Sequence, residues 1–170
     1  MDEYINLVNS KGRRIGSIEK LQAHITGKLH EAFSIFVFNQ QGQLLLQKRA
    51  LHKYHSAGLW TNTCCSHASF GEPIDEAVHR RRVQEMGFDC PLKEIATFSY
   101  KTTNLANNLI ENEYDHIFIG TVDQVDVIFN PDEVCQFKWI DLNSLETDVA
   151  DNPQNYTSWF KKILSRHLIK

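Results

Sequence analysis

Apolar residues are densest over residues 33–38, where successive side chains would face both sides of a strand. This pattern predicts a central strand over 32–38, and the polar turn 39–42 followed by the β-rich segment 43–48 predicts a hairpin. The same patterning predicts further strands over 95–102, 113–122 and 134–140, and helices over 72–86, ended by Gly87, and over 156–168. Strands mixed with helices, without repeats or a linker, predict one α/β (α+β) domain over 1–170.

The helix predicted over 72–86 breaks its own apolar stripe. Positions 74, 78, 81 and 85 fall within an arc of about 60°, and they hold Ile74, Val78, Arg81 and Glu85. The first two mark the side that should face the core, so Arg81 and Glu85 bring charges to that side. Because an unpaired buried charge is costly, this pair either forms a mutual salt bridge or lines a polar cleft that holds a ligand.

Composition narrows the classes of protein. The chain has 170 residues, with 18 Lys and Arg against 21 Asp and Glu, and a formal net charge of −3. This length supports a stable core, and the absence of a basic run argues against nucleic acid or a membrane as the main partner. The first residues do not resemble a secretory signal and no apolar segment could span a bilayer, so we expect a cytoplasmic protein. The sequence leaves the oligomeric state open, and a monomer is our expectation.

Histidines and carboxylates suggest a metal site. His24 and His30 precede the first predicted strand, His67 lies further along, and Glu111 and Glu113 share one face of an extended segment. Three imidazoles and two carboxylates would make a mixed nitrogen and oxygen site for Mn²⁺, Zn²⁺ or a similar divalent ion. Spacing alone leaves open the alternative that each histidine is an isolated surface or core residue.

The cysteines are too few for a secreted disulfide framework, so they are buried, metal-binding or catalytic thiols. If the segment before His67 is extended, Cys65 and His67 lie on one face and Cys64 on the other. Two alternatives stay open. Cys64 and Cys65 can be two small buried residues, or Cys65 and His67 can supply two ligands to zinc.

These residues stand in motifs that resemble a known family. Residues 58–67 read Gly-Leu-Trp-Thr-Asn-Thr-Cys-Cys-Ser-His, residues 30–34 read His-Glu-Ala-Phe-Ser, and residues 111–113 read Glu-Asn-Glu. Over about residues 20–159 the chain resembles the type I isopentenyl-diphosphate Δ-isomerases, a branch of the Nudix fold. The resemblance implies a mixed β-sheet packed between helices. It also implies an enzyme of isoprenoid biosynthesis that converts isopentenyl diphosphate into dimethylallyl diphosphate through a tertiary carbocation.

The resemblance further implies roles for individual residues. One divalent metal, Mn²⁺, Zn²⁺ or Mg²⁺, would be held by His24, His30, His67, Glu111 and Glu113. Glu85 would help to hold a Mg²⁺ that bridges to the substrate diphosphate, whose oxygens would be clamped by Lys20, Arg49, Lys53 and Arg81. Cys65 and Glu113 would handle the protons, with Glu113 the preferred donor, and Tyr100 and Trp159 would surround the hydrocarbon end. No glycine-rich dinucleotide fingerprint is present, so we expect no organic cofactor.

Two other functions compete with this one. A Nudix pyrophosphohydrolase needs several glutamates on one helix, following G-x5-E-x7-R-E-U-x-E-E-x-G-U, where U is a bulky apolar residue. The corresponding stretch, 66–88, has Arg81 and Gln84 where two of these glutamates should be, which argues against hydrolysis. A metal-stabilised binding module without catalysis would have no use for Cys65 beside His67 or for basic residues near Glu85.

Overall fold

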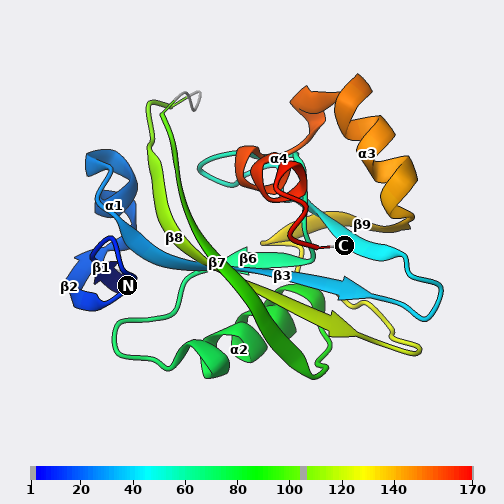
Figure 1. The fold of residues 1–170 in the computed structure, drawn as a ribbon, viewed down its shortest axis with the longest axis horizontal. Helices are drawn as coiled ribbons and strands as arrows, with labels where there is room; N and C mark the ends of the chain where they lie inside the picture. Colours follow the sequence, from blue (N-terminus) through cyan, green and yellow to red (C-terminus); the bar gives the residue numbers. More distant parts are fainter. Residues whose placement is uncertain (1–2, 104–106, 170) are drawn as a thin grey trace.

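The central strand of the fold is β3 (His30–Phe38), in a computed structural model that describes residues 3–103 and 107–169. One edge of β3 pairs in parallel with β8 (Glu111–Thr121) over nine residues. Its other edge is shared by β1 (Tyr4–Val8), β6 (Cys64–Ser66) and β4 (Leu44–Arg49), all antiparallel. Residues far apart in sequence therefore meet along one strand (Figure 1).

The sheet divides where β3 and β4 separate. Their predicted hairpin is present, but a single pair, Phe38 with Leu44, joins the two strands. β4 then pairs with β9 (Val134–Ile140) and β5 (Trp60–Thr61). Further out, β7 (Leu92–Thr102) pairs with β8, and β2 (Arg14–Glu19) with β1.

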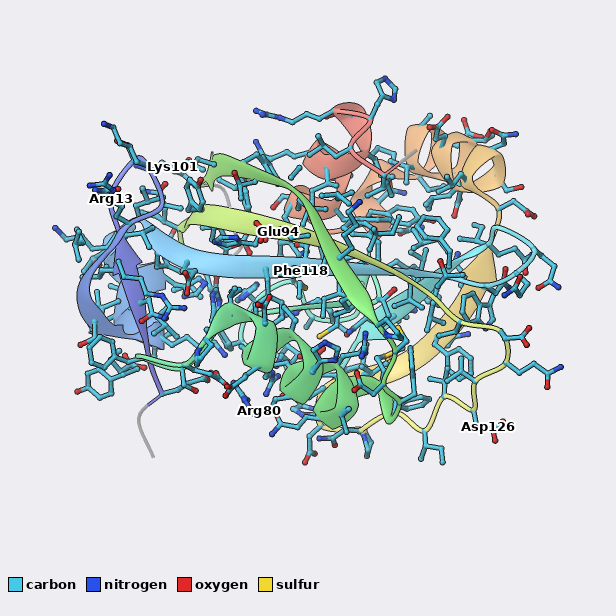
Figure 2. The ribbon with its side chains drawn as sticks, turned by 60° about the horizontal axis from the view of Figure 1, so that its bottom comes forward. Arg13, Arg80, Glu94, Lys101, Phe118 and Asp126 are labelled. Atoms are coloured by element: carbon cyan, nitrogen blue, oxygen red, sulfur yellow. The ribbon has the colours of Figure 1, made fainter. Side chains whose placement is uncertain are left out.

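Helices cover both faces of the sheet, as the family resemblance implies. α2 (Ile74–Met86) lies against one face, and α3 (Leu142–Asp151), η1 (Pro153–Asn155) and α4 (Ser158–Ser165) lie on the other, while α1 (Lys20–Thr26) follows β2 (Figure 1). Alternating residues of β3 serve the two layers: Phe33 packs in the cluster that contains Val78 of α2, and Phe36 in the cluster that contains Phe160 of α4. Phe118 of β8 joins the α2 layer (Figure 2).

The predicted elements are present with shifted ends. α2 begins at Ile74, two residues later than predicted, because Pro73 before it has an extended backbone, and it ends at Gly87 with φ 76° as predicted. The last helix is shorter than the predicted 156–168. The sequence analysis missed β1, β2, α1, β5, β6 and α3. Within the described ranges, no helix has the length and apolar character needed to cross a membrane.

Candidate active site

One cavity collects most of the predicted site residues. Its wall is built from β3, β6, β8, α2 and α4, the first residue of α1, and the end of β4 with the loop that follows it. The predicted residues that line it are Lys20, Arg49, Lys53, Cys65, His67, Arg81, Glu85, Glu111, Glu113 and Trp159. The other three, His24, His30 and Tyr100, are buried beside Glu113.

Three histidines converge on one carboxylate oxygen. His24 comes from α1, His30 from the start of β3, and His67 from just beyond β6. Their Nε2 atoms lie 4.0, 3.5 and 3.8 Å from Oε1 of Glu113, and one ligand atom from each of the four residues lies within 4.8 Å of the others. Four buried donors in this arrangement match the ligand set of a divalent ion.

The main chain turns each ring toward this centre. The Nδ1 atoms of His24, His30 and His67 are hydrogen-bonded to backbone carbonyl oxygens at 2.8, 2.8 and 3.0 Å. Each Nδ1 therefore carries the proton and each Nε2 keeps a free lone pair, which is the usual state of a metal-binding imidazole. In the described parts of the chain, Nε2 of His24 and of His30 have no hydrogen-bond partner. These buried, unpartnered nitrogens fit a metal ion.

Burial and mutual contacts set the charges of this cluster. Desolvation lowers the pKa values of His24 and His67, so both rings are neutral at pH 7. Burial also acts to raise the pKa of Glu113, but the adjacent imidazoles of His30, His67 and His24 outweigh it, and this pKa is lowered. The second oxygen of Glu113 accepts a hydrogen bond of 2.5 Å from the Tyr100 hydroxyl.

Glu111 lies beside the four-residue cluster rather than within it. It shares the inward face of β8 with Glu113, as the alternation predicts, but its Oε1 lies 3.5 Å from Nδ1 of His55, and its Oε2 accepts a hydrogen bond of 3.1 Å from Ser158. Burial and the neighbouring Glu113 raise the pKa of Glu111 to about 8.

The two neighbouring cysteines face opposite sides of β6. Cys64 is fully buried in the cluster under α2, whereas Cys65 lines the cavity, and Ser34 of β3 is its partner across the sheet. The predicted alternation is therefore correct. Burial raises the pKa of the Cys65 thiol to about 12, so this thiol is protonated at neutral pH.

Arg81 and Glu85 satisfy both alternatives that the helix pattern left open. Nη2 of Arg81 lies 2.7 Å from Oε1 of Glu85, and both side chains line the cavity. The other oxygen of Glu85 accepts a hydrogen bond of 2.9 Å from Gln47 of β4. Arg80, unlike Arg81, does not line the cavity: it pairs with Glu72 on the outer side of α2 (Figure 2).

Aromatic side chains line the part of the cavity next to Arg49. Trp159 of α4 is 3% exposed, and the guanidinium carbon of Arg49 lies 5.4 Å from the centre of its ring. The ring of His55 meets Trp159 edge-on at 5.9 Å and stacks on His24 at 5.5 Å.

Four residues near the cavity escaped the sequence analysis: Gln47, Tyr54, His55 and Glu133. The last three lie in loops, where neither periodicity nor the motifs indicate an inward side chain. Gln47 could have been singled out from the sequence, because it is a polar residue within the apolar strand β4.

The fold and the site define the class of this protein. A family model described as NUDIX domain matches residues 28–160. Among solved structures, DR0079 from Deinococcus radiodurans superposes with a TM-score of 0.80 at 21% identity, covering 99% of this chain and 100% of the other. The MutT protein from Methanosarcina mazei superposes with a TM-score of 0.65 at 18% identity, covering 81% and 91%. The chain thus has the Nudix fold.

Curated relatives narrow the class further. "Isopentenyl-diphosphate Delta-isomerase 2" from Photorhabdus laumondii is 54% identical, covering 97% of this chain and 92% of the relative. "Isopentenyl-diphosphate Delta-isomerase" from Serratia proteamaculans is 44% identical, covering 96% and 90%. The chain belongs to the isopentenyl-diphosphate Delta-isomerases of the Nudix family.

Proposed function

We propose that this protein is an enzyme that isomerises isopentenyl diphosphate to dimethylallyl diphosphate. The observation that carries the proposal is that Cys65 and Glu113 line one cavity from β6 and β8, which pair with opposite edges of β3. The reaction adds a proton to one carbon of the alkene and removes another from a neighbouring carbon. Two proton-handling groups on either side of a flat alkene suit this chemistry.

Which group donates the proton stays a prediction, with Glu113 as donor and Cys65 as acceptor. The Tyr100 hydroxyl donates a hydrogen bond to Glu113 and so orients its carboxyl group, while burial raises the pKa of Tyr100 and keeps the proton on the phenol. The raised pKa of Cys65 favours the opposite assignment, with Cys65 as donor, because it keeps a proton on the thiol before substrate binds.

The intermediate is a tertiary carbocation, and its surroundings must stabilise it without reacting with it. The indole of Trp159 meets this requirement, since a desolvated cation–π contact contributes about 2 kcal/mol. Its burial among Tyr156, Phe160 and Ile163 fixes the ring at the cavity wall and keeps water away from it.

The cations that line the same cavity bind the diphosphate. Lys20, Arg49, Lys53 and Arg81 all line it, which supports their role as the clamp. Because the diphosphate stays attached throughout, its binding energy positions the alkene between Cys65 and Glu113.

Two metal sites belong to this proposal. His24, His30, His67 and Glu113, with Glu111 next to them, would hold one divalent ion, and Glu85 would hold the Mg²⁺ that accompanies the diphosphate. The ions supply positive charge that favours the ionised carboxylate and the bound diphosphate. The chain's own residues orient the rings through backbone carbonyls and hold Glu85 through Gln47.

The test is an assay of purified protein with isopentenyl diphosphate and Mg²⁺, following both dimethylallyl diphosphate and released phosphate. We expect the isomer to form without phosphate. Phosphate without isomer would instead indicate a pyrophosphohydrolase, and the absence of both products would indicate a binding module.

The remaining expectations concern the whole protein. We infer a single domain over residues 1–170 that acts as a monomer in the cytoplasm on a small-molecule substrate. Light scattering on purified protein should give a mass near the 19.7 kDa of one chain. Cell fractionation tests the location.

A further inference from the structure

Two cations of the predicted clamp share an anionic partner in the chain itself. Nζ of Lys53 lies 2.6 Å from Oε2 of Glu133, and Nη2 of Arg81 lies 3.2 Å from Oε1 of the same carboxylate. Each oxygen of Glu133 thus serves a different cation. Glu133 also lines the cavity, although no motif of the sequence marks it.

The backbone fixes Glu133 in this position. Its amide donates a hydrogen bond to the carbonyl of Asn130, and its carbonyl accepts one from Ala50, in the turn that carries Lys53. The amide of Asn130 in turn donates to the carbonyl of Glu85 at the end of α2. The main chain therefore links the carboxylate to both segments that supply its cations.

We propose that Glu133 is an internal substitute for the substrate diphosphate. In the resting chain it neutralises Lys53 and Arg81 and holds them facing the cavity, and an incoming diphosphate must take these cations from it. This inference rests on the proposed function, because it uses the same clamp, and it adds a positioning residue to that clamp.

The exchange has a consequence for Mg²⁺. Arg81 bridges Glu133 and Glu85, so its guanidinium offsets the repulsion between two carboxylates that lie close together. A diphosphate that draws both Arg81 and Lys53 away leaves the two carboxylates without their cations, in a partly buried site where this is unfavourable. A divalent cation restores the balance. The binding of Mg²⁺ and that of diphosphate should therefore reinforce each other, with Glu133 contributing to this coupling.

A purely structural role for Glu133 predicts a different result. If Glu133 only supported the clamp, its removal would leave Lys53 and Arg81 poorly ordered and would weaken the binding of any anion. If it competes with the diphosphate, its removal frees both cations and strengthens anion binding when Mg²⁺ is absent.

The experiment measures inorganic pyrophosphate binding by calorimetry, with and without Mg²⁺, to the full chain and to its Glu133→Gln variant. The amide keeps the shape of the side chain but removes its charge. Without Mg²⁺, we expect the variant to bind pyrophosphate about fivefold more tightly than the unsubstituted chain, and the enhancement by Mg²⁺ to shrink by a similar factor.

The matched control is Glu72→Gln. It also removes a carboxylate paired with an arginine, Arg80, but outside the cavity, so pyrophosphate affinity should not change. Thermal unfolding of both variants establishes that they fold.

Unchanged or weaker binding by a folded Glu133→Gln variant overturns the inference and leaves the proposed function intact. If the unsubstituted chain binds no pyrophosphate under either condition, the clamp assignment and the inference about Glu133 both fail, and the isomerase assay decides the proposed function separately. If it binds pyrophosphate with the expected coupling but forms no isomer, the proposed function fails and the role of Glu133 stands.

Discussion

At the scale of single residues, the site depends on the side chains that flank each functional group. The three imidazoles are oriented by carbonyl oxygens of Lys20, Lys28 and Glu31, so no single side-chain substitution removes this support. Glu113, by contrast, is held by side chains: the Tyr100 hydroxyl at one oxygen and the three imidazoles at the other. The orientation of the three imidazoles is therefore set by the backbone, whereas that of the Glu113 carboxylate depends on partner side chains.

The two adjacent cysteines allow a sharp test. We expect Cys65→Ser to lower kcat by at least about a hundredfold, because the variant loses a proton-handling group, an effect typically worth 10²–10⁴. Cys64→Ser should keep most of its activity, although it places a hydroxyl in the cluster under α2 and lowers stability. Steady-state kinetics at matched metal content measures both.

The outcome that contradicts this assignment is an equal loss in both variants. Such a loss would mean that the wrong thiol was chosen or that the strand register is wrong. Far-UV circular dichroism on each variant shows whether a loss of activity reflects misfolding.

At the scale of elements, the sequence predicted strands and helices that are long enough to show a periodic pattern and missed the shortest strands. β3, β8 and β9 are long enough for their patterns to be visible, and Gly87 marked the end of α2. β5 and β6 have two and three residues, too short for any period, and they are strands because longer neighbours pair with them. The rule that strands alternate still predicted the faces of Cys64 and Cys65 correctly.

The same limit applies to the candidate site. Periodicity within α2 singled out Arg81 and Glu85, because the local pattern there conflicts with burial. The convergence of the histidines on Glu113 could be anticipated only through the family resemblance, since separate elements bring them together. His55 and Glu133 lie in loops, whose side chains are directed by tertiary contacts that leave no local trace.

The end of α2 provides a prediction about stability. Gly87 has φ 76°, and a Cβ there would lie 2.3 Å from the carbonyl oxygen of Ile128. Gly87→Ala should therefore lower the free energy of unfolding by roughly 2–4 kcal/mol, through backbone strain together with the clash. Chemical denaturation measures the loss.

Gly42 offers a matched control for this substitution. It has a similar φ of 75°, and a Cβ there would meet nothing within 4 Å. Gly42→Ala should cost only about 1–2 kcal/mol from the left-handed backbone. Equal losses at both positions would show that contact with Ile128 does not constrain the end of α2.

At the scale of the whole molecule, the histidine cluster ties the fold together. Its members come from α1, β3, the segment after β6, and β8, so an ion bound there would link four parts of the chain. Because the unfolded chain cannot bring these donors together, binding of an ion would stabilise the folded state.

Metal removal tests this link. At about 100 times the dissociation constant, an ion adds about 2.7 kcal/mol of stability. For a chain of this size, we expect Zn²⁺ or Mn²⁺ to raise the Tm of the chelator-treated protein by roughly 5–10 °C. Differential scanning calorimetry measures the shift.

Substitutions identify the ligands in that experiment. Glu113→Gln should lose most of the shift, whereas His116→Asn should retain it, because His116 pairs with Glu94 and does not line the cavity. A full shift in Glu113→Gln would remove Glu113 from the ligand set.

The parallel pairing of β3 with β8 also affects the order in which the protein is assembled. During synthesis, His24, His30 and His67 leave the ribosome well before Glu113. Parallel pairing between strands so distant in sequence forms slowly. A nascent chain therefore has three imidazoles before it has the carboxylate, and an ion acquired at that stage stays exchangeable until β8 docks. For an ion bound at this cluster, the metal that the folded protein retains would be set by the ions available at that last step of folding.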